Sequence, residues 1–494
     1  MGVNKGTRVG ILISNRPEWL FSLFGAAMAG ATVVAMNTFS TPQELRHQLK
    51  VADIGVVITE AEVASNHFVN YLISLCPQLA KNRTGRLESA DFPFLRQVIC
   101  IDRGKARGSI YDWEEFLATG AAVPDDLLEA AAAAANATDD ALIFFSSGST
   151  ALPKAIRQTH RAATLQCWRM GKMYDFDSSV RTWNANGYFF SGNFAMSFGT
   201  LCRGGCLVML RYFDPDKALD LIQQEKVSCI IAWPHQEERF KECPAWATGD
   251  FSHVKWVTYF SVFREHPSTS IDWKGFDGYG MTETFTFVAL IAGEDNTDRS
   301  QGKVLPGNTI KIIDPASGET LPIGETGEII IKGPTLTPGY IGVPPEDTFD
   351  ESGFLHTSDA GYFSVDGKLF WKGRLSDIIK TGGANVSPAE IDGIISQHPD
   401  IQASFTVGVP HDSLGEIVVS CVVLREGRLL TEDDVKAFGR GYLSGYKVPR
   451  EVLFFAEDEL PLTGSNKIKT ADLRAIAADR LACTQALHNP GETT

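Results

Sequence analysis

The first 60 residues alternate between short apolar runs and stretches with helical spacing, and this alternation constrains the fold more than any other feature. Apolar runs at 9–14, 32–36 and 55–59 predict strands, and the stretches 17–29 and 42–51 predict helices between them. Strands joined by helices favour parallel pairing, because parallel neighbours need a long crossover connection. The opening of the chain therefore predicts an α/β fold with a mostly parallel sheet.

The same rhythm continues to the middle of the chain and then changes. Further strands are predicted at 141–145, 206–210 and 227–232. The alanine tract 130–135 predicts a helix, since alanine is the strongest helix former. Later, short strands alternate with Gly/Pro turns, which indicates a β-rich subdomain over about 305–373.

The alternation of short strands and Gly/Pro turns ends near residue 373, and a compact α+β pattern follows. Its predicted strands are 405–409, 416–424 and 451–455. We therefore predict two domains. Residues 1–373 form a large N-terminal domain of mixed, mostly parallel sheets with helices and the β-rich subdomain, and residues 374–494 form a small α+β C-terminal domain.

The composition argues against several classes of protein. A net charge of −15 disfavours a nucleic-acid-binding protein, which needs a basic surface. The 9 cysteines form no CxxC pair, so free thiols are expected rather than metal ligands. The longest apolar run, 21–36, is too short to span a membrane and lacks the basic flank of a signal peptide. We expect a cytoplasmic protein, and the sequence contains no signal for its oligomeric state.

A loop rich in small and hydroxyl residues follows the strand predicted at 141–145. It reads Ser-Ser-Gly-Ser-Thr-Ala-Leu-Pro-Lys and ends at Lys154. Hydroxyls and backbone N–H groups can surround an anion, and the lysine adds a positive charge. The Gly-Lys-Ser/Thr ending of a Walker A loop is missing. The loop is either an ordinary turn or a phosphate-binding loop, whose candidate residues are Ser146, Ser147, Gly148, Ser149, Thr150 and Lys154.

Three further positions carry groups suited to a nucleotide. In Tyr-Gly-Met-Thr-Glu, at 279–283, a ring, a hydroxyl and a carboxylate would suit a base face, a phosphate oxygen and Mg²⁺. Asp359 follows a predicted strand end, where its carboxylate could accept two ribose hydroxyls. Arg374, at the domain junction, could hold an anion or the ribose. Taken singly, these motifs also fit a capped helix start, an exposed turn and a flexible linker.

A fifth motif, Pro-Leu-Thr-Gly-Ser-Asn-Lys-Ile, presents Lys467 on a loop near the C-terminus. Alone it would indicate a surface lysine. The order and spacing of all five motifs, however, resemble the adenylate-forming superfamily: acyl- and aryl-CoA synthetases, peptide-synthetase adenylation domains and firefly luciferase. The resemblance runs from Val9 to about Ile468 and is strongest to acyl- or aryl-CoA ligases. It implies a large N-terminal domain and a small, mobile C-terminal domain.

The resemblance assigns roles to the motif residues. The loop ending at Lys154 would bind the phosphates of ATP. Tyr279 would stack on adenine, Thr282 would contact phosphate, and Glu283 would hold Mg²⁺. These assignments place the nucleotide against the large domain.

The remaining roles concern the ribose and the second domain. Asp359 would bind the ribose with the help of Arg374. Ser376 occupies the hinge position of the family. Lys467 would contact the carboxylate and the α-phosphate during adenylation, which makes it a catalytic residue together with Thr282 and Glu283.

This sequence departs from the family pattern in a few places. Ala151 and Ala155 stand where the family usually has glycine, and a positive φ at Ala151 would cost about 1 kcal/mol. Asn466 replaces the glycine before the catalytic lysine. The segment 260–263 replaces the usual Gly-Gly-Ala, and the chain begins almost at its first predicted strand. These departures motivate one alternative, a non-catalytic nucleotide-binding homologue.

The resemblance implies that a substrate carboxylate attacks the α-phosphate of ATP and releases pyrophosphate, leaving an acyl-adenylate. The segment 380–391 is similar to the one that lines the pantetheine tunnel of acyl-CoA ligases, with Gly382 and Gly383 as CoA-contacting residues. We therefore expect coenzyme A as the acceptor. An amine acceptor, which would make the chain an amide ligase, is the nearest enzymatic alternative.

By the same resemblance, the acid pocket draws on the segments 188–194 and 231–235. The first segment lacks the aspartate that holds the α-ammonium group in amino-acid-activating members, which disfavours an α-amino acid. Phe190, Phe194 and Trp233 predict a bulky apolar acid, either aryl, cyclic or fatty. The alternative is that these aromatic residues belong to the core.

Overall fold

The computed structural model describes residues 2–81, 87–146, 153–259, 261–298, 300–375, 379–386, 388–461, 468 and 470–488. The chain divides into two compact units, and the division in the second half of the chain falls between Leu375 and Ser376. The boundary predicted from the sequence, between residues 373 and 374, lies just before this point. Each unit has its own sheets and its own hydrophobic core.

A seven-stranded sheet organises the first half of the larger unit, in the order β5-β4-β3-β1-β2-β6-β7. Neighbouring strands are parallel except for β6 and β7, which are antiparallel. The strands are β1 (Arg8–Leu12), β2 (Thr32–Ala35), β3 (Val56–Thr59), β4 (Gln97–Cys100), β5 (Tyr111–Asp112), β6 (Asp140–Ser146) and β7 (Lys154–Thr159). The parallel α/β arrangement predicted from the sequence is confirmed.

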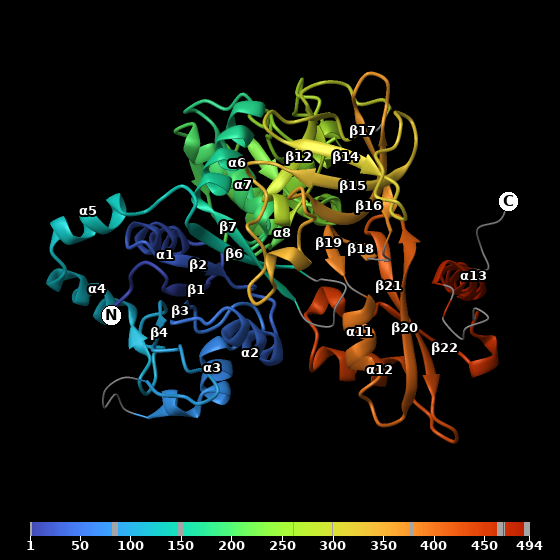
Figure 1. Cartoon of the computed structure of the whole chain (residues 1–494), viewed down its shortest axis with the longest axis horizontal. Helices are drawn as coiled ribbons and strands as arrows, with labels where there is room; N and C mark the ends of the chain where they lie inside the picture. The colour runs from blue at the N-terminus through green and yellow to red at the C-terminus, as the bar shows by residue number, and fades with distance from the viewer. Residues whose placement is uncertain are drawn as a thin grey trace. The chain divides into compact units, whose positions relative to one another are not determined.

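Helices cover both faces of this sheet, because alternate residues of its strands belong to two different cores. Val9 and Ile11 pack in one core with α1, α6 and α7, whereas Leu12 and Val34 pack in another with α2 and α3. Figure 1 shows α1 on one side of the sheet and α2 and α3 on the other. These helices are α1 (Pro17–Met28), α2 (Pro42–Val51), α3 (Phe68–Leu75), α6 (His160–Met173) and α7 (Ser191–Cys202).

A smaller parallel sheet, in the order β10-β8-β9, follows in the chain. It comprises β8 (Arg181–Asn184), β9 (Cys206–Val208) and β10 (Cys229–Ile231). Trp183 and Ile230 of this sheet pack with Phe240 and Phe251 in a third core. The other helices of the unit are α4 (Trp113–Thr119), α5 (Asp125–Ala133), α8 (Pro215–Gln224), α9 (Pro234–Glu238) and α10 (Pro244–Thr248). The predicted alanine helix is thus the end of α5.

Two antiparallel sheets complete the larger unit. One, which was not predicted, contains β11 (Phe276–Met281), β12 (Thr286–Ala292) and β13 (Lys303–Val304). The other contains β14 (Thr309–Ile313), β15 (Gly327–Lys332), β16 (Leu355–Phe363) and β17 (Leu369–Arg374). Asp359 lies inside β16 and not after a strand end as predicted. The polar run Thr-Ser-Asp reads as a turn, yet β16 pairs with β15 and β17 on either side.

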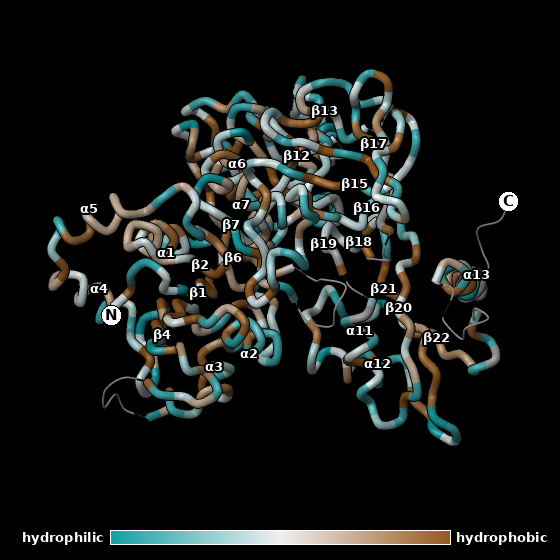
Figure 2. Tube along the Cα trace, in the orientation of Figure 1, coloured by the Kyte–Doolittle hydropathy of each residue, from teal (hydrophilic) through white to brown (hydrophobic). Residues whose placement is uncertain are grey.

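The second unit is α+β, as predicted. Its sheet has the order β19-β18-β21-β20, with β22 paired to β21. Its strands are β18 (Ile379–Thr381), β19 (Ala384–Val386), β20 (Ile401–His411), β21 (Gly415–Leu424) and β22 (Glu451–Phe454), and its helices are α11 (Pro388–Ile395), α12 (Glu432–Arg440) and α13 (Thr470–His488). Figure 2 shows hydrophobic residues along β20 and β21, and those facing α11 and α12 form the core of this unit.

Among the described residues, none of the helices combines the length and the apolar character that crossing a membrane requires.

Candidate active site

The predicted phosphate loop joins two paired strands of the large sheet. Ser146 ends β6, Lys154 begins β7, and these two residues are partners in the antiparallel register. The two ends of the loop are therefore adjacent. Its central residues, Ser147, Gly148, Ser149, Thr150 and Ala151, lie outside the described residues.

Lys154 and Glu283 meet on the same aromatic side chain. The Nζ atom of Lys154 lies 4.9 Å from the centre of the Tyr340 ring, over its face. The Tyr340 hydroxyl donates a hydrogen bond of 3.0 Å to Glu283 Oε1. All three side chains are half-buried. A lysine ammonium over a tyrosine ring gains a cation–π attraction, so Tyr340 positions both the cation and the carboxylate.

Pairing of the segment around Tyr340 with β7 brings these groups together. The backbone N–H of Ile341 donates to the Ala155 carbonyl at 3.0 Å, and the Thr337 hydroxyl donates to the Arg157 carbonyl at 2.7 Å. Tyr340 itself forms an isolated antiparallel bridge with strand β7. The backbone of this strand therefore determines where the tyrosine stands, although the two segments are far apart in sequence.

The Tyr-Gly-Met-Thr-Glu motif turns sharply between β11 and β12. A Cβ at Gly280 would lie 2.0 Å from the Thr286 carbonyl oxygen, so this position accepts only glycine. The Thr282 carbonyl accepts a hydrogen bond of 2.6 Å from Gln158 Nε2, a side chain of β7. Phe285, which follows the turn, has a φ of 64°. The motif is thus a strand followed by a single 3₁₀ turn, in which Thr282 and Glu283 are neighbours.

A second tyrosine–carboxylate pair lies at the other end of the motif. The Tyr279 hydroxyl donates to Asp359 Oδ2 at 2.8 Å, and both residues are buried, at 6% and 4% exposure. The backbone N–H of Asp359 donates to the Thr357 hydroxyl at 3.1 Å. Asp359 stands directly opposite Arg374 in the β16–β17 register. Three of the predicted nucleotide residues, from three strands, therefore occupy one region.

The donor set fits a magnesium ion held mainly by its substrate. Mg²⁺ is usually bound by one or two carboxylates and by phosphate oxygens, and not by an all-protein cage. Glu283 supplies one carboxylate, with Oε1 held by Tyr340. The described residues contain no group of three or more His, Cys, Asp or Glu that could hold a metal ion. Glu283 is thus the side chain that would hold Mg²⁺ together with the phosphates.

Several predicted residues of the second unit are placed only in part. Ser376 and Lys467 lie outside the described residues, and for Arg374 the backbone alone is described. Gly382 and Gly383 form the two-residue turn between β18 and β19, with φ of 55° and 80°. A turn of this kind needs positive φ at both central positions, which explains the paired glycines.

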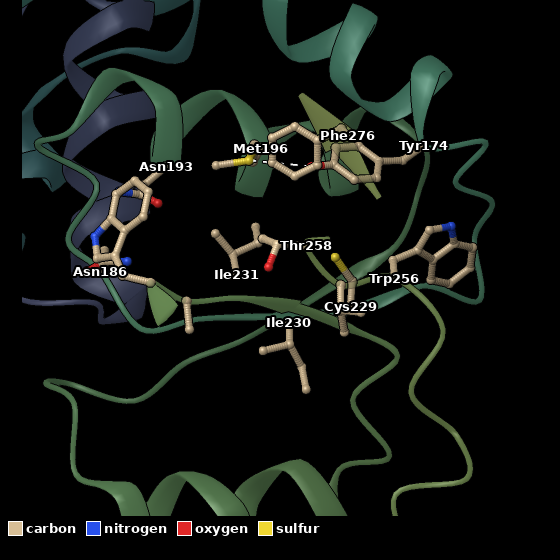
Figure 3. Close-up of a pocket in the computed structure, with 13 residues that line it drawn as sticks. Tyr174, Asn186, Asn193, Met196, Cys229, Ile230, Ile231, Trp256, Thr258 and Phe276 are labelled. Atoms are coloured by element: carbon tan, nitrogen blue, oxygen red, sulfur yellow. Dashed lines mark hydrogen bonds between the residues drawn. The ribbon is translucent and has the colours of Figure 1, made fainter. Parts of the chain in front are cut away.

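A small cavity lies between α7, β10 and the start of β11. Its volume is about 30 Å³. Figure 3 shows its lining, which includes Tyr174, Asn186, Asn193, Met196, Trp233 and Phe276. The Tyr174 hydroxyl contacts Met196 Sδ at 3.5 Å. Burial raises the pKa of the Tyr174 hydroxyl, and burial raises the pKa of the Cys229 thiol to about 12, so both groups stay neutral at physiological pH.

The three predicted acid-pocket aromatics occupy different places. Trp233 lines the cavity. Phe194 is 3% exposed and stacks on Phe198 in the core, with ring centres 4.0 Å apart. Phe190 is half-buried and packs against Phe189. Neither Phe190 nor Phe194 is among the described residues that line the cavity, so their contact with an acid stays a prediction.

The sequence of the chain matches two family models. The model described as AMP-binding enzyme matches residues 1–341, and the one described as AMP-binding enzyme C-terminal domain matches residues 390–467. Together they cover well over half of the chain. This chain belongs to the AMP-binding enzymes. The resemblance to the adenylate-forming superfamily is thereby confirmed, and the chain is an enzyme of that superfamily.

Relatives of this AMP-binding enzyme extend over nearly all of it. It is 30% identical to 4-coumarate–CoA ligase 1 of Oryza sativa subsp. japonica, over 96% of this chain and 83% of the relative. It is 27% identical to a putative acyl-CoA synthetase of Bacillus subtilis, over 96% and 88% of the two chains. Among solved structures, the amide bond synthetase McbA of Marinactinospora thermotolerans has a TM-score of 0.75 at 24% identity, with 96% and 91% covered. This last likeness shows the fold alone.

Sequence reasoning missed two residues of this AMP-binding enzyme, Tyr340 and Asn186, that the structure brings to the site. Tyr340 follows a Pro-Gly pair that reads as a turn, and nothing in that segment indicates its contact with Lys154. Asn186 lies just before the segment 188–194 predicted for the acid pocket, and its amide next to this aromatic segment was the available signal. Asn193 lies within that segment, although the prediction named only its aromatic residues.

Proposed function

We propose that this chain activates a carboxylic acid with ATP, forming an acyl-adenylate and pyrophosphate, and then transfers the acyl group to coenzyme A. The products are an acyl-CoA thioester and AMP. The observation that carries the proposal is the meeting of Lys154 and Glu283 on Tyr340, because it unites the phosphate-loop lysine with the motif carboxylate. The proposed acid is bulky and mainly apolar, and the cytoplasm is its proposed location.

Adenylation depends more on charge neutralisation than on covalent catalysis. The attacking carboxylate and the α-phosphate are both anionic, so catalysis depends on positioning and on cations near the reacting oxygens. Lys154 supplies one cation at the end of the phosphate loop, and Lys467 would supply another. Mg²⁺ bound at Glu283 would add neutralisation of the phosphate oxygens. Tyr340 keeps Lys154 and Glu283 in fixed places before ATP arrives.

The nucleoside half of ATP would lie against Tyr279 and Asp359. The Asp359 carboxylate is held by the Tyr279 hydroxyl at 2.8 Å, which orients it before a ribose binds. A carboxylate carries about four lone-pair sites, enough to accept from the Tyr279 hydroxyl and from the two ribose hydroxyls.

Coenzyme A is proposed as the acceptor because the relatives named above include a CoA ligase and an acyl-CoA synthetase over nearly the whole chain. The glycine pair at Gly382 and Gly383 makes a turn with no side chains at its tip, which would let a pantetheine chain pass close to the backbone.

Pyrophosphate release tests this function. The chain is incubated with ATP, Mg²⁺ and a panel of aryl, cyclic and fatty acids, with coenzyme A, with an amine, or with neither. We expect release with at least one acid, accelerated by coenzyme A with loss of free thiol. Acceleration by the amine instead would support the amide ligase. No release with any acid would support a non-catalytic nucleotide-binding homologue.

A variant separates the two half-reactions. Lys467→Ala should abolish adenylation and leave acyl transfer from a preformed adenylate, because the lysine would act on the α-phosphate. Arg428→Ala, which removes an exposed side chain of the same unit, is the matched control. Equal loss of both half-reactions in the Lys467 variant would count against its assigned role.

A further inference from the structure

Two asparagine side chains reach the cavity with an amide atom that has no hydrogen-bond partner among the described residues. These atoms are Asn186 Nδ2 and Asn193 Oδ1. Asn186 is 8% exposed and Asn193 is 2% exposed. Figure 3 shows both at one end of the cavity, with Tyr174 and Trp256 towards the other end. An unpaired buried amide is costly, so this end favours a polar group from outside the chain.

A chain of hydrogen bonds establishes that Asn186 presents a donor. The backbone N–H of Trp233 can only donate, and it donates to Gln236 Oε1 at 2.9 Å. The other end of the Gln236 amide is therefore its NH₂ group, which donates to Asn186 Oδ1 at 3.0 Å. The end of Asn186 that remains is its own NH₂ group, so the cavity contains a donor at this position.

The side chain of Asn184 ties the two asparagines together. Its Oδ1 accepts from the backbone N–H of Asn186 at 2.9 Å. Its Nδ2 donates to the backbone carbonyl of Asn193 at 3.3 Å and to Ser197 Oγ at 2.8 Å. Because both asparagines are bonded to one amide, they are neighbours in space. The same end of the cavity therefore holds the Asn186 donor and the Asn193 Oδ1 acceptor.

The lining also limits what can bind there. The described residues that line the cavity include no Asp, Glu, Lys, Arg or His. A charged group would enter without a counter-charge, which is strongly unfavourable. The volume of about 30 Å³ accommodates roughly one or two water-sized groups. A small neutral group that both accepts and donates a hydrogen bond fits these conditions, and a hydroxyl is the simplest one.

Strand β11 connects the cavity to the nucleotide side. Phe276 lines the cavity at the start of this strand, and Tyr279 lies three residues later. At about 3.3 Å per residue, the two positions are about 10 Å apart along the strand. A group in the cavity therefore lies at the far end of an acid whose carboxylate reaches the α-phosphate.

We propose that this cavity binds a hydroxyl group at the end of the substrate acid remote from its carboxylate. Asn186 Nδ2 donates to the hydroxyl oxygen, and the hydroxyl donates to Asn193 Oδ1. This inference rests on the proposed function and narrows it, from a bulky apolar acid to one that carries a terminal hydroxyl. Asn186 and Asn193 are then the residues that distinguish a hydroxylated acid from its unsubstituted counterpart.

Three matched acids test the subsite with the full chain, ATP and Mg²⁺. They are phenylpropanoic acid, its para-hydroxy derivative and its para-methoxy derivative, which accepts a hydrogen bond without donating one. We expect kcat/KM for pyrophosphate release to be about ten- to a hundredfold higher with the hydroxy acid than with the unsubstituted acid, since the latter leaves both amides unpaired. The methoxy acid should also fall below the hydroxy acid.

Variants assign this preference to the two amides. Asn193→Leu removes the acceptor, so the preference should fall to threefold or less, and the rate with the unsubstituted acid should rise. Asn186→Leu removes the donor for the hydroxyl oxygen, together with the acceptor of Gln236, and adds no charge and no new acceptor, so it should also lower the preference to threefold or less. Cys202→Ala, at the exposed end of the same helix and outside the cavity lining, is the control and should leave the ratio between the acids unchanged.

Two results would overturn the inference while leaving the proposed function intact. One is equal kcat/KM for the three acids, and the other is a hydroxyl preference that both asparagine variants retain. If no acid releases pyrophosphate, the proposed function fails separately. Calorimetric titration of the hydroxy and unsubstituted acids without ATP then decides the subsite: tighter binding of the hydroxy acid supports it, and equal binding contradicts it.

Discussion

In the region that we propose binds the nucleotide, tyrosines contact the charged groups: Tyr340 contacts Lys154 and Glu283, and Tyr279 donates to Asp359. In the region that we propose binds the acid, the cavity is lined by neutral groups, and Asn186 and Asn193 each keep an amide atom without a partner among the described residues. The first region is organised before its ligand arrives, whereas the second keeps hydrogen-bonding capacity for one.

This difference indicates that the two regions have different roles, one in binding phosphate and the other in selecting the acid. A phosphate group has a fixed shape and charge, so its site can be preorganised by hydrogen bonds among protein groups. A substrate acid must be distinguished from similar acids. This discrimination is strongest where a competing acid lacks a polar group and so leaves buried polar groups of the protein unpaired. Changes on the nucleotide side should therefore affect all acids equally, and changes on the acid side should affect acids differently.

The largest effect is expected from Glu283→Gln. The variant keeps the shape of the side chain but removes the charge that would hold Mg²⁺, so pyrophosphate release should fall about 10³-fold with every acid. Steady-state rates over a range of Mg²⁺ concentrations provide the measurement. The control Glu319→Gln, at an exposed position of the same unit, should release pyrophosphate at the same rate as the parent chain. A loss confined to some acids would break the comparison.

A stability effect of about 3 kcal/mol is expected from the buried carboxyl of Glu237 in α9. Burial raises the pKa of Glu237 to about 7, although it accepts hydrogen bonds from the Ser261 hydroxyl and from the backbone N–H of Val262. Because the folded-state pKa lies above the ordinary value of 4.5, protonation favours the folded state. This contribution is complete below about pH 4.5 and is lost as the pH rises through about 7.

Glu237→Gln isolates this contribution, because glutamine can accept the same two hydrogen bonds without titrating. The free energy of unfolding from urea denaturation should decline more between pH 5 and pH 8 in the parent chain than in the variant, by about 3 kcal/mol. Identical pH dependence in the two proteins would show that Glu237 does not titrate in this range.

A smaller effect is expected from Asp359→Asn. The Tyr279 hydroxyl can still donate to the amide oxygen, but the amide cannot accept from two ribose hydroxyls as a carboxylate does. We expect about a tenfold higher KM for ATP, with the ratio between acids unchanged. Asp366→Asn, at an exposed position near the same sheet, serves as the control. An unchanged KM for ATP would remove Asp359 from the nucleotide site.

The smallest effect is expected from Tyr340→Phe. Phenylalanine keeps the ring face for Lys154 and loses the hydrogen bond to Glu283, so the rate should fall about threefold. Tyr340→Leu loses both contacts, so its rate should fall further than that of Tyr340→Phe. If the two variants are equally active, the ring face contributes nothing and Tyr340 does not position the lysine.

Much of the fold could be predicted because its signals are local. Fully buried parallel strands such as β1 and β3 are continuous apolar runs, and helices of the expected length separate them. The β11–β13 sheet was missed although β12 is an apolar run, because β11 carries two glycines that resemble a turn and β13 has only two residues. The polar run at Asp359 was misread for the same reason: pairing with strands on both sides, which is not local, makes it a strand.

The sequence by itself determined the family, because five short motifs with groups suited to phosphate, ribose and carboxylate occur along it in the order typical of that family. It also identified Lys154, Glu283 and Asp359 as candidates, since charged groups in such motifs are distinctive. Only the tertiary structure decided that Tyr340 joins two of these residues, and that Asn186 and Asn193 share one end of a neutral cavity. Those contacts depend on which strands and helices pack together. Packing brings together residues that are distant in sequence, and the local sequence around each residue does not indicate the contact.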